Sequence, residues 1–367
     1  MAADLAQKAA RLVQSPVVRM WLLSRGIVLL ALLTAHLVKF DDFASLLAWD
    51  GKWYRDIAWH GYLDSPEGAA RFFPVWPLIA RWAAAPLPVS PGVMLVVLAN
   101  LATFAYLALA RRVALAAKMD QLTADRVPAV VAFAPGATVL VMGYTEPLFG
   151  VLLCLVLLTC LRRRWLECAV AGLLVGALRP TGVVLALPVA IEACRRIQRA
   201  GQPELLARLA AVCAPAFGLA AYLGWAWVAF GDALTPFRVQ LDPALRGGLL
   251  VNPLETLAHI PSLLGNRGLV GINLNLLFVL VSIVLLVLGA RRLPLSFTVF
   301  SAVTLLLAIT AQNFNSFERY ASSAVPLLLV AANVLSERPR LRRFAVVAGP
   351  ILLFGQSMLI FGGWYLP

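Results

Sequence analysis

The chain has 367 residues, of which 61% are hydrophobic and 13% charged, and its net charge is +13. Soluble domains are about 45–50% apolar and about 25% charged, so this composition excludes a soluble globular protein, a disordered chain and a disulfide-rich secreted scaffold. The long continuous apolar runs also differ from the alternating strands of a transmembrane β-barrel. The sequence therefore predicts an all-α polytopic membrane protein that forms a single domain over residues 1–367.

Apolar runs predict about eleven transmembrane helices, several of them shorter than the roughly 20 residues that a span normally needs. The first run has Arg25 inside it and no small-residue cleavage site after it, so we expect a retained helix rather than a signal peptide. The runs are Met20–Val38, Pro91–Ala110, Val127–Val141, Pro147–Leu161, Trp165–Leu178, Gly182–Ala193, Leu209–Phe230, Leu269–Ala290, Leu293–Ala311, Ala321–Leu335 and Phe344–Phe361.

The basic residues predict the orientation of these helices. They fall in short clusters between apolar runs, a pattern typical of cytoplasmic loops and not of a nucleic-acid-binding surface. With the N-terminus in the cytoplasm and the C-terminus outside, the inner segments hold 21 Lys and Arg against 7 Asp and Glu, and the outer segments 10 against 11. The clusters are Arg111-Arg112, Arg162-Arg163-Arg164, Arg195-Arg196, Arg291-Arg292 and Arg340 with Arg342-Arg343.

Two outer loops are too long to be simple turns, and they span residues 39–90 and 231–268. The first contains Phe72–Trp82, which is apolar but short and has two prolines, so we expect an interfacial helix there. A helix from Ser45, as its N-cap, to His60 would place Asp50 and His60 on one apolar, aromatic face. A carboxylate on such a face is costly unless it has a partner or a task. The alternative is an aromatic belt at the interface with solvated acids.

Further polar residues are expected at the outer ends of later helices, where ionisable groups usually line a cavity or a pathway. The simpler alternatives are snorkelling for Arg179 and a surface ion pair between Glu318 and Arg319. These polar positions are Tyr144 and Glu146, Arg179, Gln312 with Asn313, and Glu318 to Tyr320. The five cysteines form no CxxC motif and no pattern with histidine, so we expect buried small residues and not a disulfide framework or a zinc site.

Several motifs together resemble the PIG-V-like mannosyltransferases, bacterial relatives of the second GPI mannosyltransferase within the GT-C class of membrane glycosyltransferases. The likeness covers about residues 20–335. The eukaryotic members tend to have His-Phe where this chain has Lys52-Trp53, so a GPI precursor is not the expected acceptor. The matching segments are WDGKWYRDIA from Trp49, Gly61-Tyr62, FFPVWPL from Phe72, YTEPLF from Tyr144, RPTG from Arg179, Gly231-Asp232 with Pro236-Phe237 and Gln240, and Arg319-Tyr320 with Pro326-Leu327.

The resemblance implies an outward-facing site, a polyprenyl-phosphate-mannose donor and an acidic base in the first outer loop, which by motif position is Asp50. The chemistry of the residues agrees: sugar transfer from a phosphate needs one base, and arginine forks suit the departing phosphate. We expect Arg319, with Arg179 and Arg238 as further candidates, to bind the donor phosphate. The expected substrate-binding residues are Trp49, Trp53, Asp56, His60, Tyr144, Glu146, Gln312 and Tyr320.

We expect no cofactor, because a monophosphate donor does not demand a neutralising metal, although the adjacent Asp41 and Asp42 leave metal dependence open. The expected partners are the donor, a lipid or glycan acceptor and membrane lipids, with no nucleic acid. The absence of an N-x-Ser/Thr sequon and the excess of Arg over Lys favour a bacterial plasma-membrane protein. Two alternatives remain: the same fold using glucose, arabinose or another polyprenyl-linked sugar, and a lipid flippase or transporter.

Overall fold

The computed structural model describes residues 15–38, 45–242, 252, 255, 269–310 and 316–365, and the side chains of 269–274 are not described. Asp41, Asp42, Gln312 and most of the second outer loop lie outside the described residues. Within these ranges the chain is all-helical and has no strand, as predicted. Four of the described helices are long and apolar enough to cross a membrane: α2 (Pro16–Leu37), α5 (Pro91–Ala116), α10 (Gln202–Phe230) and α17 (Pro339–Phe361).

The remaining apolar runs also contain helices, most of them shorter. Several apolar helices together support a membrane protein. The shorter apolar helices are α7 (Glu146–Leu161), α8 (Trp165–Leu178), α9 (Ala186–Cys194), α14 (Leu295–Ile309) and α16 (Val325–Glu337), whereas α13 (Leu269–Ala290) has 22 residues and is apolar over its described side chains, Asn275–Ala290. The other elements are α3 (Asp50–His60), α4 (Val75–Ala84), α6 (Gln121–Ala132), α11 (Thr235–Leu241), α15 (Phe317–Ser322) and the 3₁₀ turns η1 (Glu67–Arg71), η2 (Ala137–Leu140), η3 (Pro180–Leu185) and η4 (Ile197–Arg199).

The segment expected to span as Val127–Val141 is not one helix, so that prediction is wrong. Helix α6 ends at Ala132, Pro135 follows, and Gly136 takes a positive φ of 81° before η2 begins. A proline disfavours helical backbone in the residue before it, and a positive φ favours glycine. A side chain at Gly136 would also lie 3.2 Å from the backbone of Arg319. The break therefore brings non-helical backbone close to α15.

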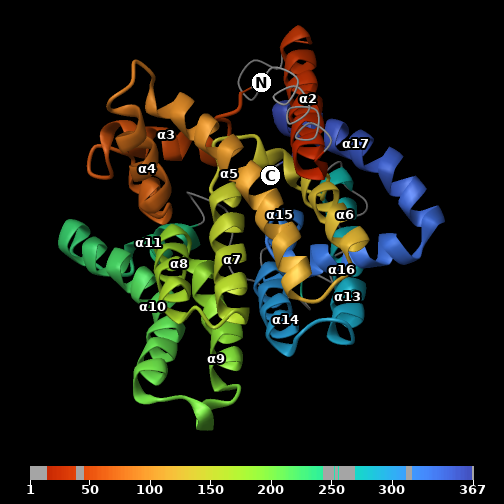
Figure 1. Cartoon of the computed structure of the whole chain (residues 1–367). Helices are drawn as coiled ribbons and strands as arrows, with labels where there is room; N and C mark the ends of the chain where they lie inside the picture. The colour runs from red at the N-terminus through yellow and green to blue at the C-terminus, as the bar shows by residue number, and fades with distance from the viewer. Residues whose placement is uncertain are drawn as a thin grey trace, which may run out of the picture.

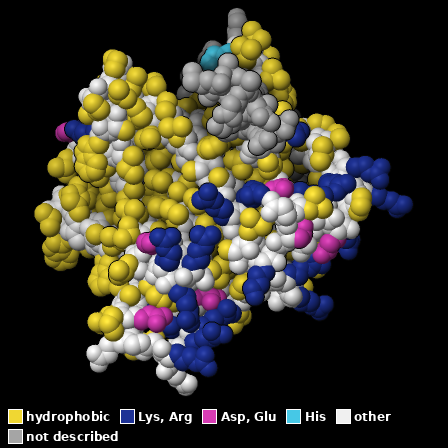
Figure 2. Space-filling model, viewed as in Figure 1, with side chains coloured by type: hydrophobic (Ala, Val, Ile, Leu, Met, Phe, Trp, Pro, Cys, Tyr) yellow, Lys and Arg dark blue, Asp and Glu magenta, His cyan; other side chains and the backbone are white. Residues whose placement is uncertain are grey.

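The short helices α3 and α4 pack on each other at one end of the molecule, at the upper left of Figure 1. The α7–α8, α9–α10 and α13–α14 connections, which contain three of the basic clusters, lie toward the opposite end (Figure 1). Figure 2 shows Lys and Arg side chains gathered on the lower part of this face, and hydrophobic side chains over much of the rest. These basic connections therefore share one end, away from the first outer loop.

Helices α8 and α10 cross in close contact because glycines line their interface. A side chain at Gly176 would overlap the carbonyl oxygen of Pro215, and one at Gly218 would overlap that of Leu173. Gly172, four residues before Gly176, faces the ring of Pro215 at 3.2 Å. Small residues at four-residue spacing let membrane helices approach closely. This Gly172–Gly176 pair is a packing motif that the sequence analysis did not single out.

We expect Gly176→Ala to destabilise the protein by about 1–3 kcal/mol, since the added methyl group meets backbone that cannot rotate away. Thermal unfolding in detergent measures the effect. Gly224→Ala is the matched control, because Gly224 lies on α10 with nothing within 4 Å of the position of a Cβ atom. That substitution should be neutral or stabilising, as alanine has the higher helix propensity. Equal melting temperatures for the two variants would contradict the packing argument.

Candidate active site

Asp50 is the first residue of α3, which places its carboxylate at the positive end of that helix. The helix does not begin at Ser45 as predicted: Ser45 Oγ accepts a hydrogen bond from the amide of Leu47 in a turn, and Trp49 is the N-cap. Trp49 has a φ of 56°, an unfavourable value for a bulky residue. Its indole donates to the carbonyl of Ile360 on α17. Strain of this kind is often found at functional sites.

Four charged side chains from distant parts of the sequence form one chain of ion pairs. Asp50 Oδ2 is 2.8 Å from Arg319 Nη1, and Arg319 Nε is 3.4 Å from Glu146 Oε1. The same oxygen of Glu146 is 2.7 Å from Arg179 Nη1. The Asp50 side chain is 30% exposed, whereas those of Arg319 and Glu146 are 5% and 6% exposed. The chain therefore has its accessible end at Asp50.

Aromatic rings enclose the two arginines. Arg319 lies 5.7 Å from the centre of the Tyr144 ring and 5.2 Å from that of Tyr320. Arg179 lies 5.7 Å from the centre of the Tyr320 ring and 5.5 Å from that of Phe149. The Tyr144 hydroxyl also accepts a hydrogen bond from the amide of Asp50, at the start of α3. These contacts fix the guanidinium planes and join Asp50 to the segment before α7.

Electrostatics in this cluster favour charged arginines. Burial alone would lower the pKa of Arg319, but the nearby charges of Asp50 and Glu146 outweigh it and raise that pKa well above its usual range. Glu146 has the same effect on the pKa of Arg179. Burial and the charge of Asp50 raise the pKa of Tyr144, which keeps its phenol neutral. Two carboxylates thus balance two permanent cations.

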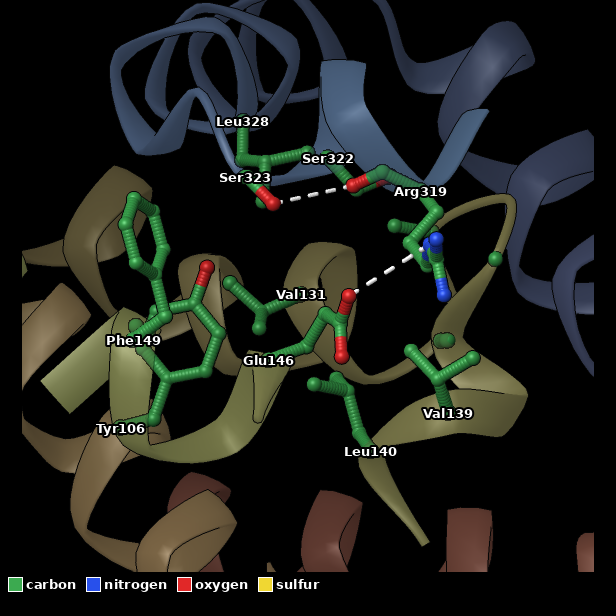
Figure 3. Close-up of a pocket in the computed structure, with 14 residues that line it drawn as sticks. Tyr106, Val131, Val139, Leu140, Glu146, Phe149, Arg319, Ser322, Ser323 and Leu328 are labelled. Atoms are coloured by element: carbon green, nitrogen blue, oxygen red, sulfur yellow. Dashed lines mark hydrogen bonds and ion pairs between the residues drawn. The ribbon is translucent and has the colours of Figure 1, made fainter. Parts of the chain in front are cut away.

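A small cavity lies behind the ion pairs, with room for about one water molecule. Figure 3 shows Glu146 and Arg319 joined at one side of it, Ser322 and Ser323 above, and apolar walls that include Phe149 and Leu328. Glu146 Oε2 is buried and has no hydrogen-bond partner among the described residues. A water in this polar corner would satisfy that oxygen.

The structure brings together six of the residues predicted from the sequence, namely Asp50, Tyr144, Glu146, Arg179, Arg319 and Tyr320. Four others lie apart from them. His60 is exposed, so its expected place on the buried face is wrong. Arg238 is 73% exposed and pairs with Asp232 at 3.2 Å. Asp56 pairs with Arg55 at 2.8 Å, and Trp53 stacks on Phe72 beneath Arg71.

Glu318 is a buried carboxylate whose environment the sequence did not reveal. It is 1% exposed, and the alternative of a surface ion pair with Arg319 is not found, because Arg319 turns to Asp50 and Glu146. Neither oxygen of Glu318 makes a well-formed hydrogen bond among the described residues, although the hydroxyl of Tyr365 lies near enough to interact. Burial raises the pKa of Glu318 above its usual value of 4.5.

We expect this raised pKa to appear in the pH dependence of stability. As the pH rises above 4.5, Glu318 ionises in the unfolded chain before it does so in the folded protein, so its effect is to lower stability until the folded pKa is passed. Glu318→Gln removes this loss. The variant should therefore gain stability relative to the wild type between pH 4.5 and neutral pH, measured by thermal unfolding across that range. A pH-independent difference would contradict the burial of a neutral carboxyl group.

The accessible Asp50 can accept a proton, and the arginines behind it can bind an anion. Within the described ranges, no group of three or more His, Cys, Asp or Glu side chains is arranged to hold a metal ion. The five cysteines are free thiols, and the expectation that all are buried is wrong for Cys194, which is exposed, and for Cys213, which is only partly buried. No protein-family model matches this chain, and no curated protein matches it either.

Proposed function

We propose that this protein is a membrane glycosyltransferase that moves a mannosyl residue from a polyprenyl-phosphate donor to a glycolipid or glycan acceptor. Asp50 is the general base in this proposal, and the site faces the extracytoplasmic side. The motifs that resemble PIG-V-like mannosyltransferases support it, because six residues in or beside those motifs meet in one cluster. The two arginines of the cluster offer the planar, bidentate donors that phosphate binding uses.

One observation carries the proposal: an accessible carboxylate at the start of α3 lies 2.8 Å from a buried arginine. A base must be reachable by the acceptor hydroxyl, and the 30% exposed side chain of Asp50 meets this condition. A phosphate leaving group must meet a fixed cation, and Arg319 lies directly behind Asp50.

The proposed reaction proceeds by inversion. The acceptor oxygen attacks C1 of the sugar, its proton passes to an oxygen of Asp50, and the C1–O bond breaks with its electron pair going to the phosphate. Polyprenyl phosphate leaves, and an α-mannoside forms from a β-linked donor. No general acid is required, because the phosphate is already a weak base.

The ion pair between Asp50 and Arg319 couples donor binding to the base. In the free protein Arg319 already has two carboxylate partners, so a donor phosphate must replace one of them. Asp50 is the accessible partner, and Glu146 is shared with Arg179. The phosphate therefore takes the place of Asp50 on Arg319, which removes a counter-ion from Asp50 and makes its carboxylate more basic.

The orientation belongs to the same proposal. The basic connections at one end of the molecule face the cytoplasm, and the end with α3, α4 and Asp50 faces outward. The proposed topology has about eleven spans, several of which are short helices in the protein interior. With this odd number the N-terminus lies inside and the C-terminus outside a bacterial plasma membrane. Short helices suit a site sunk from the outer surface, since membrane proteins tolerate irregular backbone around a cavity.

Purified protein in vesicles tests the proposal. Radiolabelled polyprenyl-phosphate mannose is supplied with a lipid extract of the host, beside glucose and arabinose donors on the same lipid. Label that moves into a new lipid or polymer from the mannose donor, and persists in EDTA, supports the proposal. If only the glucose or the arabinose donor supports transfer, that sugar takes the place of mannose as the proposed substrate. If no donor supports transfer and the polyprenyl lipid instead moves from one leaflet of the vesicle membrane to the other, the result would favour a flippase.

A further inference from the structure

The segment between α6 and α7, which contains the 3₁₀ turn η2 and otherwise irregular backbone, is held by side chains from neighbouring helices. The carbonyl of Leu140 accepts hydrogen bonds from Arg25 Nη2 and Thr103 Oγ1, each at 2.7 Å. The next carbonyl, that of Val141, accepts from Asn100 Nδ2 at 3.1 Å. Buried carbonyls that no helix satisfies need such partners, above all within a membrane. Two helices, α2 and α5, therefore hold this segment in place.

Arg25 is an unusual residue to find at this position. It lies in the middle of α2, a helix of membrane length, and is 7% exposed. Its partners among the described residues are neutral: Asn100 Oδ1 at 2.9 Å, Ser24 Oγ at 2.7 Å, the Leu140 carbonyl and the ring of Trp21. A charge inside a membrane protein is costly, and such residues commonly have a functional task.

The other end of the segment is also fixed. Trp76 Nε1 donates to the carbonyl of Gly143 at 3.2 Å, and the Gly143 amide donates to the carbonyl of Leu46 at 2.9 Å. Immediately after this anchor come Tyr144, whose hydroxyl accepts from the amide of Asp50, and Glu146, which pairs with both arginines. The segment from 140 to 146 thus connects Arg25 to the ion-pair cluster through backbone held at both ends.

We propose that Arg25 and Asn100 are positioning residues for the transfer reaction, an inference that rests on the proposed function. They bind carbonyls six and five residues before Glu146, and in this way they fix the positions of Tyr144 and Glu146 relative to Arg319. The guanidinium group suits this task because its planar fork reaches Leu140, Asn100 and Ser24 in fixed directions. Neither residue touches the substrate.

The test compares Arg25→Lys and Asn100→Asp with the wild-type protein. Lysine keeps the charge but cannot reach three acceptors in one plane, and aspartate keeps the acceptor for Arg25 but cannot donate to Val141. We expect kcat for mannosyl transfer to fall at least 10-fold in each variant, with KM for the donor changed less than 3-fold. Ser301→Ala is the control, since Ser301 is buried on α14 without a hydrogen-bond partner among the described residues, and its kcat should be unchanged.

Hydrogen exchange gives a readout that does not depend on the proposed function. Peptides covering 137–146 should exchange at least 10-fold faster in both variants, while those from α8 and α10 keep their protection. Unchanged exchange in that segment, or an unchanged kcat, would overturn the inference. A uniform loss of protection across the chain in both variants would overturn it too, because Arg25 would then serve the whole fold. If the wild-type protein has no transferase activity, the proposed function is wrong. The hydrogen-exchange result then tests on its own whether Arg25 and Asn100 hold the segment 137–146 in place.

Discussion

We expect Asp50→Asn to lower the rate of sugar transfer by about 10²- to 10⁴-fold, the range that a general base contributes. Asparagine has nearly the same size and keeps the start of α3, but its amide cannot accept the proton of the acceptor hydroxyl. The measurement is the initial rate of label transfer in vesicles. KM for the donor should stay the same or fall, because Asp50 no longer competes with phosphate for Arg319.

The control for this substitution is Asp64→Asn. Asp64 belongs to the same outer loop and is exposed, and it is not part of the ion-pair cluster. Its substitution tests whether any loss of acidic charge near the membrane surface reduces activity, and we expect a rate within twofold of the wild type. Equal rates for Asp50→Asn and the wild type would show that Asp50 is not the general base, and the base would then have to be another residue.

The sequence predicted the helical class and the residues of the cluster for a clear physical reason. In a lipid bilayer the backbone N–H and C=O groups of a long apolar run can form all their hydrogen bonds only in a helix, so the length and composition of the runs indicate the helical class. Glu146, Arg179 and Arg319 stood out because ionisable groups at the ends of apolar runs are costly, and Asp50 stood out by its place on an apolar, aromatic face and by its motif position in the resemblance. Such criteria select residues without showing how they pair, and the further phosphate-binding candidate Arg238 is exposed and lies outside the cluster.

The pairing of these residues could not be predicted, because it depends on contacts between distant parts of the chain. Arg319 and Asp50 are 269 positions apart, and the sequence offered the adjacent Glu318 as the simpler partner for Arg319. The helix drawn from Ser45 was wrong in two ways: α3 begins only at Asp50, after the positive φ of Trp49, and the face that it buries contains Gly51, Tyr54, Ile57 and Ala58 and not His60. Neither feature leaves a periodic signal in the sequence.

The cluster balances two opposing requirements. A phosphate-binding arginine must be fixed and charged before the donor arrives, yet a buried cation without a counter-ion would destabilise the fold. At the buried end of the cluster, one oxygen of Glu146 is the counter-ion for both Arg179 and Arg319. At the accessible end, Asp50 is the second counter-ion for Arg319. Only the second partner can be exchanged for a ligand. In the proposed reaction the two acids therefore have different tasks, although both begin a helix and both contact Arg319.

Glu146→Gln should produce the largest loss of stability among the substitutions proposed for this protein. It leaves Arg179 and Arg319 buried, with one carboxylate for two guanidinium groups. Breaking a buried ion pair by removing one partner typically costs about 3–5 kcal/mol. Unfolding of the purified protein in mixed micelles measures the loss. Glu337→Gln is the matched control, because Glu337 pairs with Arg292 at 2.9 Å on the surface, with side chains 48% and 31% exposed, and such pairs contribute about 0–1 kcal/mol.

A second substitution separates charge balance from packing. If the cost of Glu146→Gln comes from an uncompensated cation, adding Arg179→Met removes that cation and should recover part of the lost stability, so that the double variant is more stable than Glu146→Gln alone. If the cost came from packing around the cavity, the second substitution would only add to the first. A double variant less stable than Glu146→Gln would therefore contradict a shared counter-ion. Recovered stability without recovered transfer would fit the proposed reaction, since Arg319 would still lack the carboxylate that holds its Nε.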